Sequence, residues 1–276
     1  MSQPIFSIVL KNVLCALLRY IGSYSRFLQH DDLPNVKAAL YAVAHVQHVI
    51  GAIDGTHIAL VPPRRREQVF RNRKNFYSTN FQVVCLADIY ITEVTAQFPA
   101  SVDDAYILPT SSIPHLMAPL QRDHACLIVM YRVICVPLYS AHSTPPSRFT
   151  YSFQYPNLLW LLTPLRHPST AEENGFNEAH GRTQRIIKRT FGVLKTRFRC
   201  LHLTGGALLY RPVKVSHIIV ACCMLHNLAL RHHIPLLDAE EGEAVPVADE
   251  EGVRSDEENG EDAADSRVEL IQQYFH

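Results

Sequence analysis

Asp54 is the residue of this sequence whose type and surroundings most directly suggest chemistry. It closes an apolar, β-branched run that starts at His48, and Gly55 separates it from a second short run, residues 57–61. Because an Asp-Gly pair supplies the positive φ of tight turns, this pattern predicts two adjacent strands joined at Asp54 and Gly55. A carboxylate at the end of a buried strand is costly unless it is paired or holds a metal ion. Asp54 is therefore either a metal-binding carboxylate or a plain turn residue.

Basic side chains recur in two places where they could contact nucleic acid. Arg73 and Lys74 stand among aromatic residues, a combination that suits contacts to phosphates and bases. The second place is a helix predicted over residues 177–198, whose apolar stripe leaves cations around the rest of its surface. Those cations include Arg182, Arg185, Arg189 and Lys195. Each group could equally be a solvated surface, and both interpretations remain open.

The elements that must position these residues mix helical and strand patterns. Apolar residues at helical spacing predict helices over residues 4–22, 37–43 and 213–231. Alternation of polar and apolar residues predicts a hairpin from residue 81 to residue 98 that turns near Asp88. These elements together indicate a mixed α/β domain.

Asp104 lies where a helix is predicted to begin. Ser101 is the expected N-cap, and an acid in the first turn suits the helix dipole, so a capping role is the first interpretation of Asp104. Support of a nearby site is the alternative. Residues 111–151 that follow are apolar, punctuated by proline and predicted to be irregular.

The charge of the chain is segregated although the formal total is zero. Residues 238–265 carry 13 acids and one Arg, a net charge of −12, whereas residues 1–237 carry a net charge of +12. A basic body favours a polyanionic partner, and the tail is either solvated or competes for the same surface. The acidic composition predicts disorder in the tail.

Cysteine usage and hydropathy point to a soluble intracellular protein. The seven cysteines lack the paired spacing of a zinc site or a disulfide framework, so we expect reduced thiols. The start of the chain has no basic segment typical of a signal peptide. The longest apolar run, residues 125–139, is too short to span a bilayer, so no membrane association is expected.

Several words of this sequence resemble the Harbinger (PIF-type) transposases and the nucleases derived from them. The words are GAIDGTHIALVPP, NRKNFYSTNFQVVCLAD, WLLTPLRHPSTAEENGFNEAH, RTFGVLKTRFRCL and GALLYRPVKVSHIIVACCMLHN. The resemblance implies a ribonuclease-H-like mixed sheet flanked by helices, a DDE superfamily endonuclease domain over residues 48–235. A helical segment, residues 1–47, would precede it and an acidic tail, residues 236–276, would follow. Complete members carry a DNA-binding helical module upstream, so the chain is expected to be truncated at its N-terminus.

The same resemblance implies an Asp-Asp-Glu metal site for Mg²⁺ or Mn²⁺, with Asp54 as the first acid. The second acid falls on Ser152, if residues 151–154 form the strand beside Asp54, and the third falls on Lys188. A serine carries no charge and an ammonium repels a cation, so metal binding is expected to be weakened.

Three functions remain open from the sequence. The first is metal-dependent hydrolysis of DNA phosphodiester bonds, impaired by the loss of two of three acids. The second is a non-catalytic module that binds DNA or a protein, and the family resemblance suggests a Myb-like DNA-binding partner. The third is a fragment without a selected function. The first two imply a nuclear protein, with the cytoplasm as a second location.

Overall fold

A mixed five-stranded sheet forms the centre of the molecule in the computed structural model, which describes residues 3–129, 134–137, 149–152, 158–165 and 168–236. The strand order is β3-β2-β1-β4-β7. Strands β1, β2 and β3 are antiparallel neighbours, whereas β4 and β7 run parallel to β1. The bounds are β1 Val49–Ala59, β2 Ser78–Cys85, β3 Ile91–Pro99, β4 Cys126–Val129 and β7 Leu161–Leu162. This arrangement confirms the predicted mixed sheet of ribonuclease-H type.

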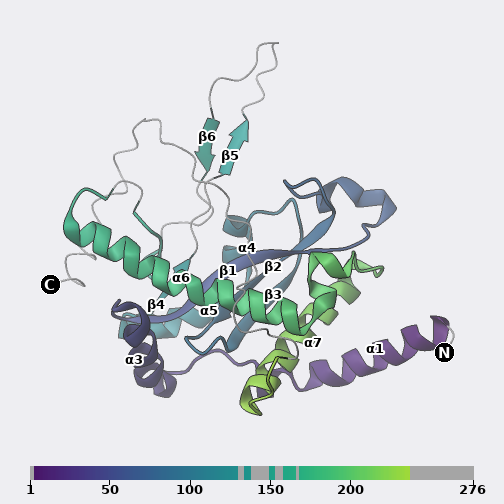
Figure 1. The fold of residues 1–276 in the computed structure, drawn as a ribbon, viewed down its shortest axis with the longest axis horizontal. Helices are drawn as coiled ribbons and strands as arrows, with labels where there is room; N and C mark the ends of the chain where they lie inside the picture. The colour runs from purple at the N-terminus through teal and green to yellow at the C-terminus, as the bar shows by residue number, and fades with distance from the viewer. Residues whose placement is uncertain (1–2, 130–133, 138–148, 153–157, 166–167, 237–276) are drawn as a thin grey trace, which may run out of the picture.

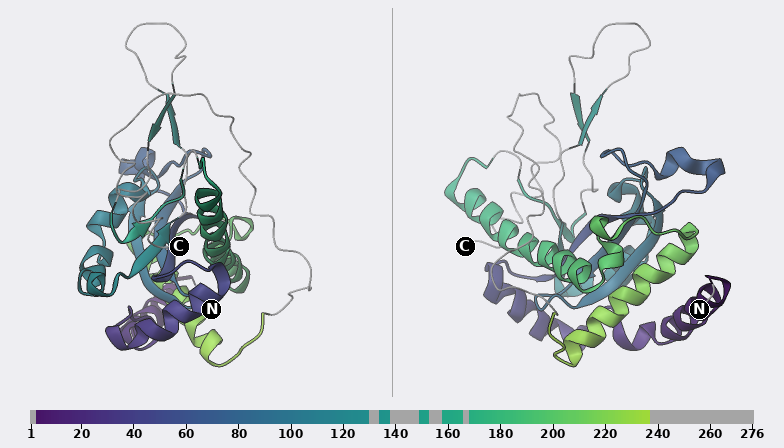
Figure 2. Two further views of the ribbon diagram at one scale, coloured as in Figure 1. Left: turned by 90° about the vertical axis from the view of Figure 1, so that its left-hand side faces the viewer. Right: turned by 45° about the vertical axis from the view of Figure 1, so that its right-hand side comes forward.

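Helices cover both faces of the sheet (Figures 1 and 2). The long helices α6 and α7 share one hydrophobic core with β1 and β2, while the short helices α4 and α5 share a second core with the other face of β1. The helix bounds are α1 Gln3–Arg19, α2 Ile21–Tyr24, α3 Leu33–Ala44, α4 Asp104–Thr110, α5 Ile113–Met117, α6 Ala171–Arg197 and α7 Pro212–Arg231. The 3₁₀ turns are η1 His30–Asp32, η2 Arg64–Phe70, η3 Ala118–Asp123, η4 Arg199–Leu201 and η5 Leu203–Gly205.

Helix α6 begins earlier than its apolar pattern predicts, at Ala171 instead of residue 177. A capping box explains this start, because the Thr170 hydroxyl accepts from the Glu173 N–H and the Glu173 carboxylate accepts from the Thr170 N–H. The predicted apolar stripe then packs on the sheet, with the Phe191 ring edge-on to Phe81 at 5.8 Å between centroids. The helix is thereby fixed across β1 and β2.

The predicted turn at Asp54 and Gly55 is wrong. Strand β1 runs without interruption through both residues, which pair with Val83 and Gln82 of β2. Gly55 does not adopt a positive φ. Its missing side chain instead makes room for Asp104, whose Oδ1 would lie 2.5 Å from a Cβ at this position. Close packing, not a change of chain direction, is the physical reason for the glycine.

The strand expected beside Asp54 is also a different one. Residues 149–152 form β6, which pairs with β5, Ile134–Pro137, in a separate two-stranded sheet. Strand β4 occupies the place next to β1, with Ile53 paired to Val129. Its uninterrupted apolar sequence suits a strand buried on both faces.

The first part of the stretch predicted to be irregular, residues 111–129, therefore contains regular structure: α5, η3 and β4. The predicted hairpin of residues 81–98 is confirmed as β2 and β3, and the helix predicted over residues 213–231 as α7. Helix α7 is long and apolar enough to cross a membrane by length and composition, but half of its residues are buried in the protein core. The predicted disorder of the acidic tail concerns residues that, beyond 236, lie outside the described part of the chain.

Candidate functional site

Asp54 lies in the middle of β1, is only 2% exposed, and faces α6. The direction follows from Thr56, two residues further along the strand, whose Oγ1 accepts a hydrogen bond of 2.8 Å from the Lys195 ammonium of α6. Side chains two residues apart in a strand point to the same face. Lys195 was a candidate for contacts to nucleic acid, and the structure instead directs its Nζ towards β1, close to Asp54.

The pKa of Cys85, in β2, is affected by the negative charge of Asp54. Burial raises the pKa of the Cys85 thiol to about 12, and the negative charges of Asp88 and Asp54 act in the same direction, although a hydrogen bond with Thr190 lowers it. Thr190 is a buried residue of α6. The Asp54 carboxylate is thus enclosed between the sheet and the second half of α6.

Lys188 lies on the same side of α6 as Lys195. Seven residues of an α-helix turn through nearly two full turns, so the two lysines differ by only about 20° around the axis and by about 10 Å along it. The helix runs in the same direction as β1, since Arg182 contacts the Ala44 carbonyl before the strand and Lys195 contacts Thr56 within it. Ten ångströms back from Thr56 is about three residues of β1, which brings Lys188 to the level of Ile53 and its neighbour Asp54.

The strand beside Asp54 supplies no acid. The four residues of β4 are Cys126, Leu127, Ile128 and Val129, all buried. Ser152, the position predicted for the second acid, belongs to β6 and is not part of the central sheet. Within the described ranges, no group of three or more His, Cys, Asp or Glu side chains is arranged to hold a metal ion. The residues present do not fit a two-metal site, which needs several carboxylates around the ions.

Asp104 supports β1 from the opposite face of the sheet. Its buried Oδ1 accepts a hydrogen bond of 2.7 Å from Asn80 of β2 and lies against Gly55. Asn80 pairs with His57, so it shares the face of Gly55 and not that of Thr56. Asp104 is the acid in the first turn of α4, as predicted, but the N-cap residue is Asp103 instead of Ser101, and its side chain makes no cap hydrogen bond. The alternative, support of the strand next to Asp54, agrees with this position.

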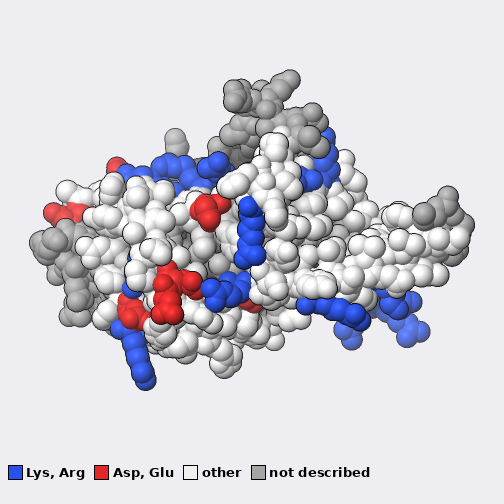
Figure 3. Space-filling view, turned by 90° about the horizontal axis from the view of Figure 1, so that it is seen from below, with Lys and Arg blue, Asp and Glu red and all other residues white. Residues whose placement is uncertain are grey.

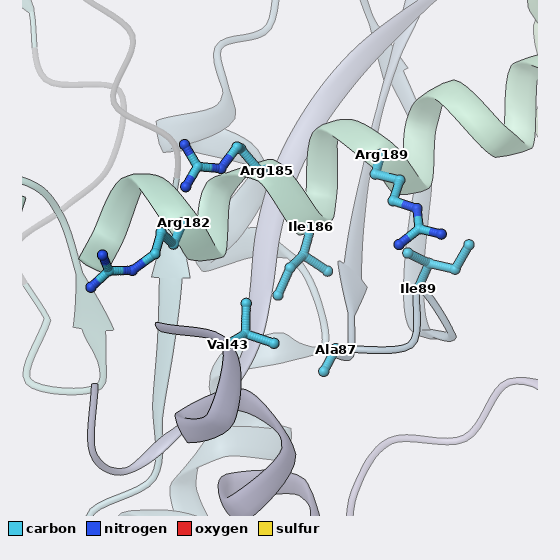
Figure 4. A pocket seen from close by; sticks show the side chains of 7 residues that line it. All are labelled: Val43, Ala87, Ile89, Arg182, Arg185, Ile186 and Arg189. Atoms are coloured by element: carbon cyan, nitrogen blue, oxygen red, sulfur yellow. The ribbon is translucent and has the colours of Figure 1, made fainter. Parts of the chain in front are cut away.

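Three of the predicted basic residues, Arg182, Arg185 and Arg189, line one groove of about 220 Å³ (Figure 4). Its apolar floor consists of Val43 at the end of α3, Ala87 and Ile89 between β2 and β3, and Ile186 of α6. The arginines could be identified from their helical spacing in the sequence. The residues of the floor come from segments that are distant in the sequence, and no sequence pattern indicates that they meet. We call this site the arginine groove.

Arg73 and Lys74 lie elsewhere. Arg73 donates a hydrogen bond of 2.6 Å to Asp103 at the start of α4, on the other side of the sheet from α6. Basic side chains on the face shown in Figure 3 also form separate groups, with acidic side chains between them. The six cations predicted to bind nucleic acid therefore do not form one continuous surface.

Comparison with known proteins gives a consistent result. The model of a family described as DDE superfamily endonuclease matches residues 53–227, which include β1 from Ile53 onwards, the other strands of the central sheet, α6 and most of α7. "Putative nuclease HARBI1" of Homo sapiens is 33% identical over 233 residues, which is 84% of this chain and 60% of that protein. The protein of the same name from Mus musculus is 34% identical over 232 residues, with the same coverage.

A plant relative is more distant. "Protein ALP1-like" of Arabidopsis thaliana is 24% identical over 218 residues, covering 75% of this chain and 49% of that protein. The chain thus spans about 60% of the length of the animal relatives and about half of the plant one. No solved structure matches the chain.

Proposed function

We propose that this chain, which belongs to the Harbinger-derived DDE superfamily nucleases, binds DNA without cleaving it efficiently. The family relationship makes DNA the expected partner and divalent-metal hydrolysis the ancestral reaction. The observation that carries the proposal is the strand next to Asp54: the described residues of β4, Cys126–Val129, are all apolar and supply no second carboxylate. Lys188, level with Asp54 on α6, replaces the third acid with a cation.

The electrostatics of these residues oppose metal-dependent catalysis. Three carboxylates would offer a charge of −3 to the metal ions, and charge on oxygen ligands supplies much of their affinity. Here Asp54 contributes −1, while Lys195 hydrogen-bonds to Thr56 on the same strand and Lys188 adds a second ammonium. An Mg²⁺ or Mn²⁺ ion placed there would meet net repulsion, so weakened binding follows.

DNA binding is assigned to the arginine groove. Arg185 and Arg189 are exposed on one side of α6, beside Arg182, and guanidinium groups suit phosphate oxygens. Such contacts carry little sequence information and depend on salt, because bound cations displace counterions from DNA. We infer a nuclear protein, with the cytoplasm as a second location. A Myb-like protein remains the candidate partner that would supply sequence specificity.

Fluorescence anisotropy with a short DNA duplex at several salt concentrations tests this function. The double variant Arg185→Gln/Arg189→Gln should bind more weakly and reduce the slope of log affinity against log salt by about 2, since each phosphate contact contributes about 0.9. The matched control is Arg19→Gln/Arg122→Gln, which removes two exposed arginines outside the groove. Equal losses in both variants would refute the assignment to the groove, and no DNA binding at all would refute the function.

A nuclease that still cleaves DNA is the competing function, favoured by the names of the animal relatives. It requires metal ligands from residues other than those described here. Metal-dependent cleavage of plasmid DNA separates the two functions.

A further inference from the structure

The arginine groove contains more hydrogen-bond donors than acceptors. Among the described residues, none of Arg182, Arg185 and Arg189 forms an ion pair. The Nε–H of Arg182 is buried and has no acceptor in the described part of the protein, although its Nη2 donates to the Ala44 carbonyl at 3.3 Å. A buried donor without a partner is costly, and three guanidinium groups along one helix face repel one another. The groove is therefore suited to an anionic occupant.

The last described residues before the acidic segment lie at the C-terminal end of α6. After α7 the chain passes Arg197 near the end of α6, whose Nη2 donates to the Ile234 carbonyl at 3.1 Å. Helix α7, which precedes Ile234, is itself held beside the groove floor, because the Nε2 of its His226 lies 3.0 Å from the carbonyl oxygen of Ile89. Four residues beyond Ile234, the acids begin with Asp238.

The distances along the two segments agree. Arg189 and Arg182 lie about 12 Å and 22 Å before Arg197 on α6, at 1.5 Å per residue. An extended chain reaches about 3.3–3.6 Å per residue, so Asp238 can reach about 14 Å from Ile234 and Glu243 about 30 Å. The four acids between these limits, Asp238, Glu240, Glu241 and Glu243, thus cover the length of the groove.

We propose that residues 238–243 of the chain's own acidic segment bind in the arginine groove. Their carboxylates supply acceptors for the Arg182, Arg185 and Arg189 guanidinium groups, and the connection through Ile234 keeps them at high effective concentration. The occupied groove is closed to phosphates, so the segment competes with DNA for the same cations. The intramolecular contact itself does not depend on the proposed function, because it requires only the groove and the acids.

The test is a double-mutant cycle on thermal stability in the full chain, without DNA. One variant neutralises the acids, with Asp238→Asn, Glu240→Gln, Glu241→Gln and Glu243→Gln. The other is Arg185→Gln/Arg189→Gln. In low salt the acid variant should melt about 2–4 °C lower, a shift typical of a modest loss of stability in a domain of this size. Combined with the arginine changes, the acid changes should have a much smaller effect, because only Arg182 then remains in the groove.

A charge-matched control neutralises four distant acids, with Asp256→Asn, Glu257→Gln, Glu258→Gln and Glu261→Gln. The effects of this control set and of the arginine changes on the melting temperature should be additive. Equal coupling for both sets would overturn it, because net charge would then explain the effect. Coupling that grows with protein concentration would also overturn it, because the acids would then come from a second copy.

DNA affinity separates this inference from the proposed function. The acid variant should bind a duplex several-fold more tightly than the unmodified chain. If the acid and arginine changes are coupled in their effect on the melting temperature but no variant binds DNA, the intramolecular contact stands and the proposed function is rejected. DNA binding through the groove without coupling on melting would reject the intramolecular contact alone.

Discussion

Gly55 illustrates how a single residue holds Asp54 in place. A methyl group at this position would meet the Asp104 Oδ1 at 2.5 Å and its Cγ at 2.9 Å. Asp104 cannot easily retreat, since it is buried and accepts a hydrogen bond from Asn80. The glycine therefore permits the close approach of α4 to β1 next to Asp54.

We accordingly predict that Gly55→Ala lowers the free energy of unfolding by about 1–3 kcal/mol, as overpacking in a core usually does. Urea denaturation followed by circular dichroism measures it. Gly192→Ala is the matched control, because nothing lies within 4 Å of a Cβ at that helical position. The control should gain about 0.5–1 kcal/mol through a lower unfolded-state entropy. A Gly55→Ala protein as stable as the unmodified chain would contradict the packing described.

His180 makes the stability of the fold depend on pH. Burial lowers the pKa of its imidazole to about 4, and its Nε2 lies 3.2 Å from the Leu162 carbonyl. The unfolded chain, with a histidine pKa near 6.5, binds the proton more readily, so stability falls as pH drops from about 6.5 to 4. At 1.36 kcal/mol per unit, the loss amounts to about 3 kcal/mol.

The variant His180→Gln keeps a donor for the carbonyl and cannot gain a proton. Its free energy of unfolding should change less between pH 6.5 and pH 4.5 than that of the unmodified chain. His217→Gln, at an exposed position of α7, should leave the pH dependence unaltered. An identical pH dependence in the His180 variant would show that this histidine does not stay neutral in the folded state.

At the scale of elements, the pairing of β4 with β1 determines where a second acid would have to stand. The last observed pair is Ile53 and Val129. Ile128 of β4 pairs with Ala52 and packs in the core shared with α6, so it lies on the face of the sheet that carries Asp54. The family resemblance had placed the second acid at Ser152, which belongs to another sheet.

We predict that Ile128→Asp with Lys188→Glu creates detectable Mn²⁺ binding by isothermal titration calorimetry, because Ile128 shares the face of Asp54 and the formal charge there becomes strongly negative. Ser152→Asp with Lys188→Glu, the pair expected from the sequence alone, serves as the control and should bind far less. Without metal, the first pair should also lower the melting temperature through carboxylate repulsion. Stronger binding in the Ser152 pair would contradict the strand order around Asp54.

Local sequence patterns predicted the helices and strands whose periodicity can be seen within the element itself. The apolar stripe of α6, the polar and apolar alternation in β2 and β3, and the apolar face of α7 needed no distant partner. Strand pairing is a long-range property, so the apolar run of β4 indicated a strand without indicating its neighbour. Gly55 misled for the same reason, since Asp104, about fifty residues away, explains it better than a turn. The local pattern already singled out Asp54, and the resemblance added its role as the first acid. The position of Lys188 came from the resemblance alone, because no local pattern could identify it.

The whole molecule combines a nuclease fold with a charge distribution that suits binding. The match over residues 53–227 establishes the family, and the helices on both faces hold Asp54 in a buried environment. The cations that the sequence placed in two candidate groups divide into three: Arg73 and Lys74 on one side, Lys195 against β1, and three arginines in one groove. In the proposed function, DNA binding and catalysis depend on different faces of α6, so the loss of catalysis leaves DNA binding in place.

Cleavage of supercoiled plasmid DNA by the purified chain, in the presence of Mg²⁺ or Mn²⁺, tests this account most directly. The same measurement on the variant Asp54→Ala provides the background, since Asp54 is the acid that the family resemblance and the geometry both retain. The account predicts that the two proteins nick the plasmid equally slowly, with no dependence on the metal. Metal-dependent nicking by the unmodified chain that disappears in the Asp54→Ala variant would contradict it.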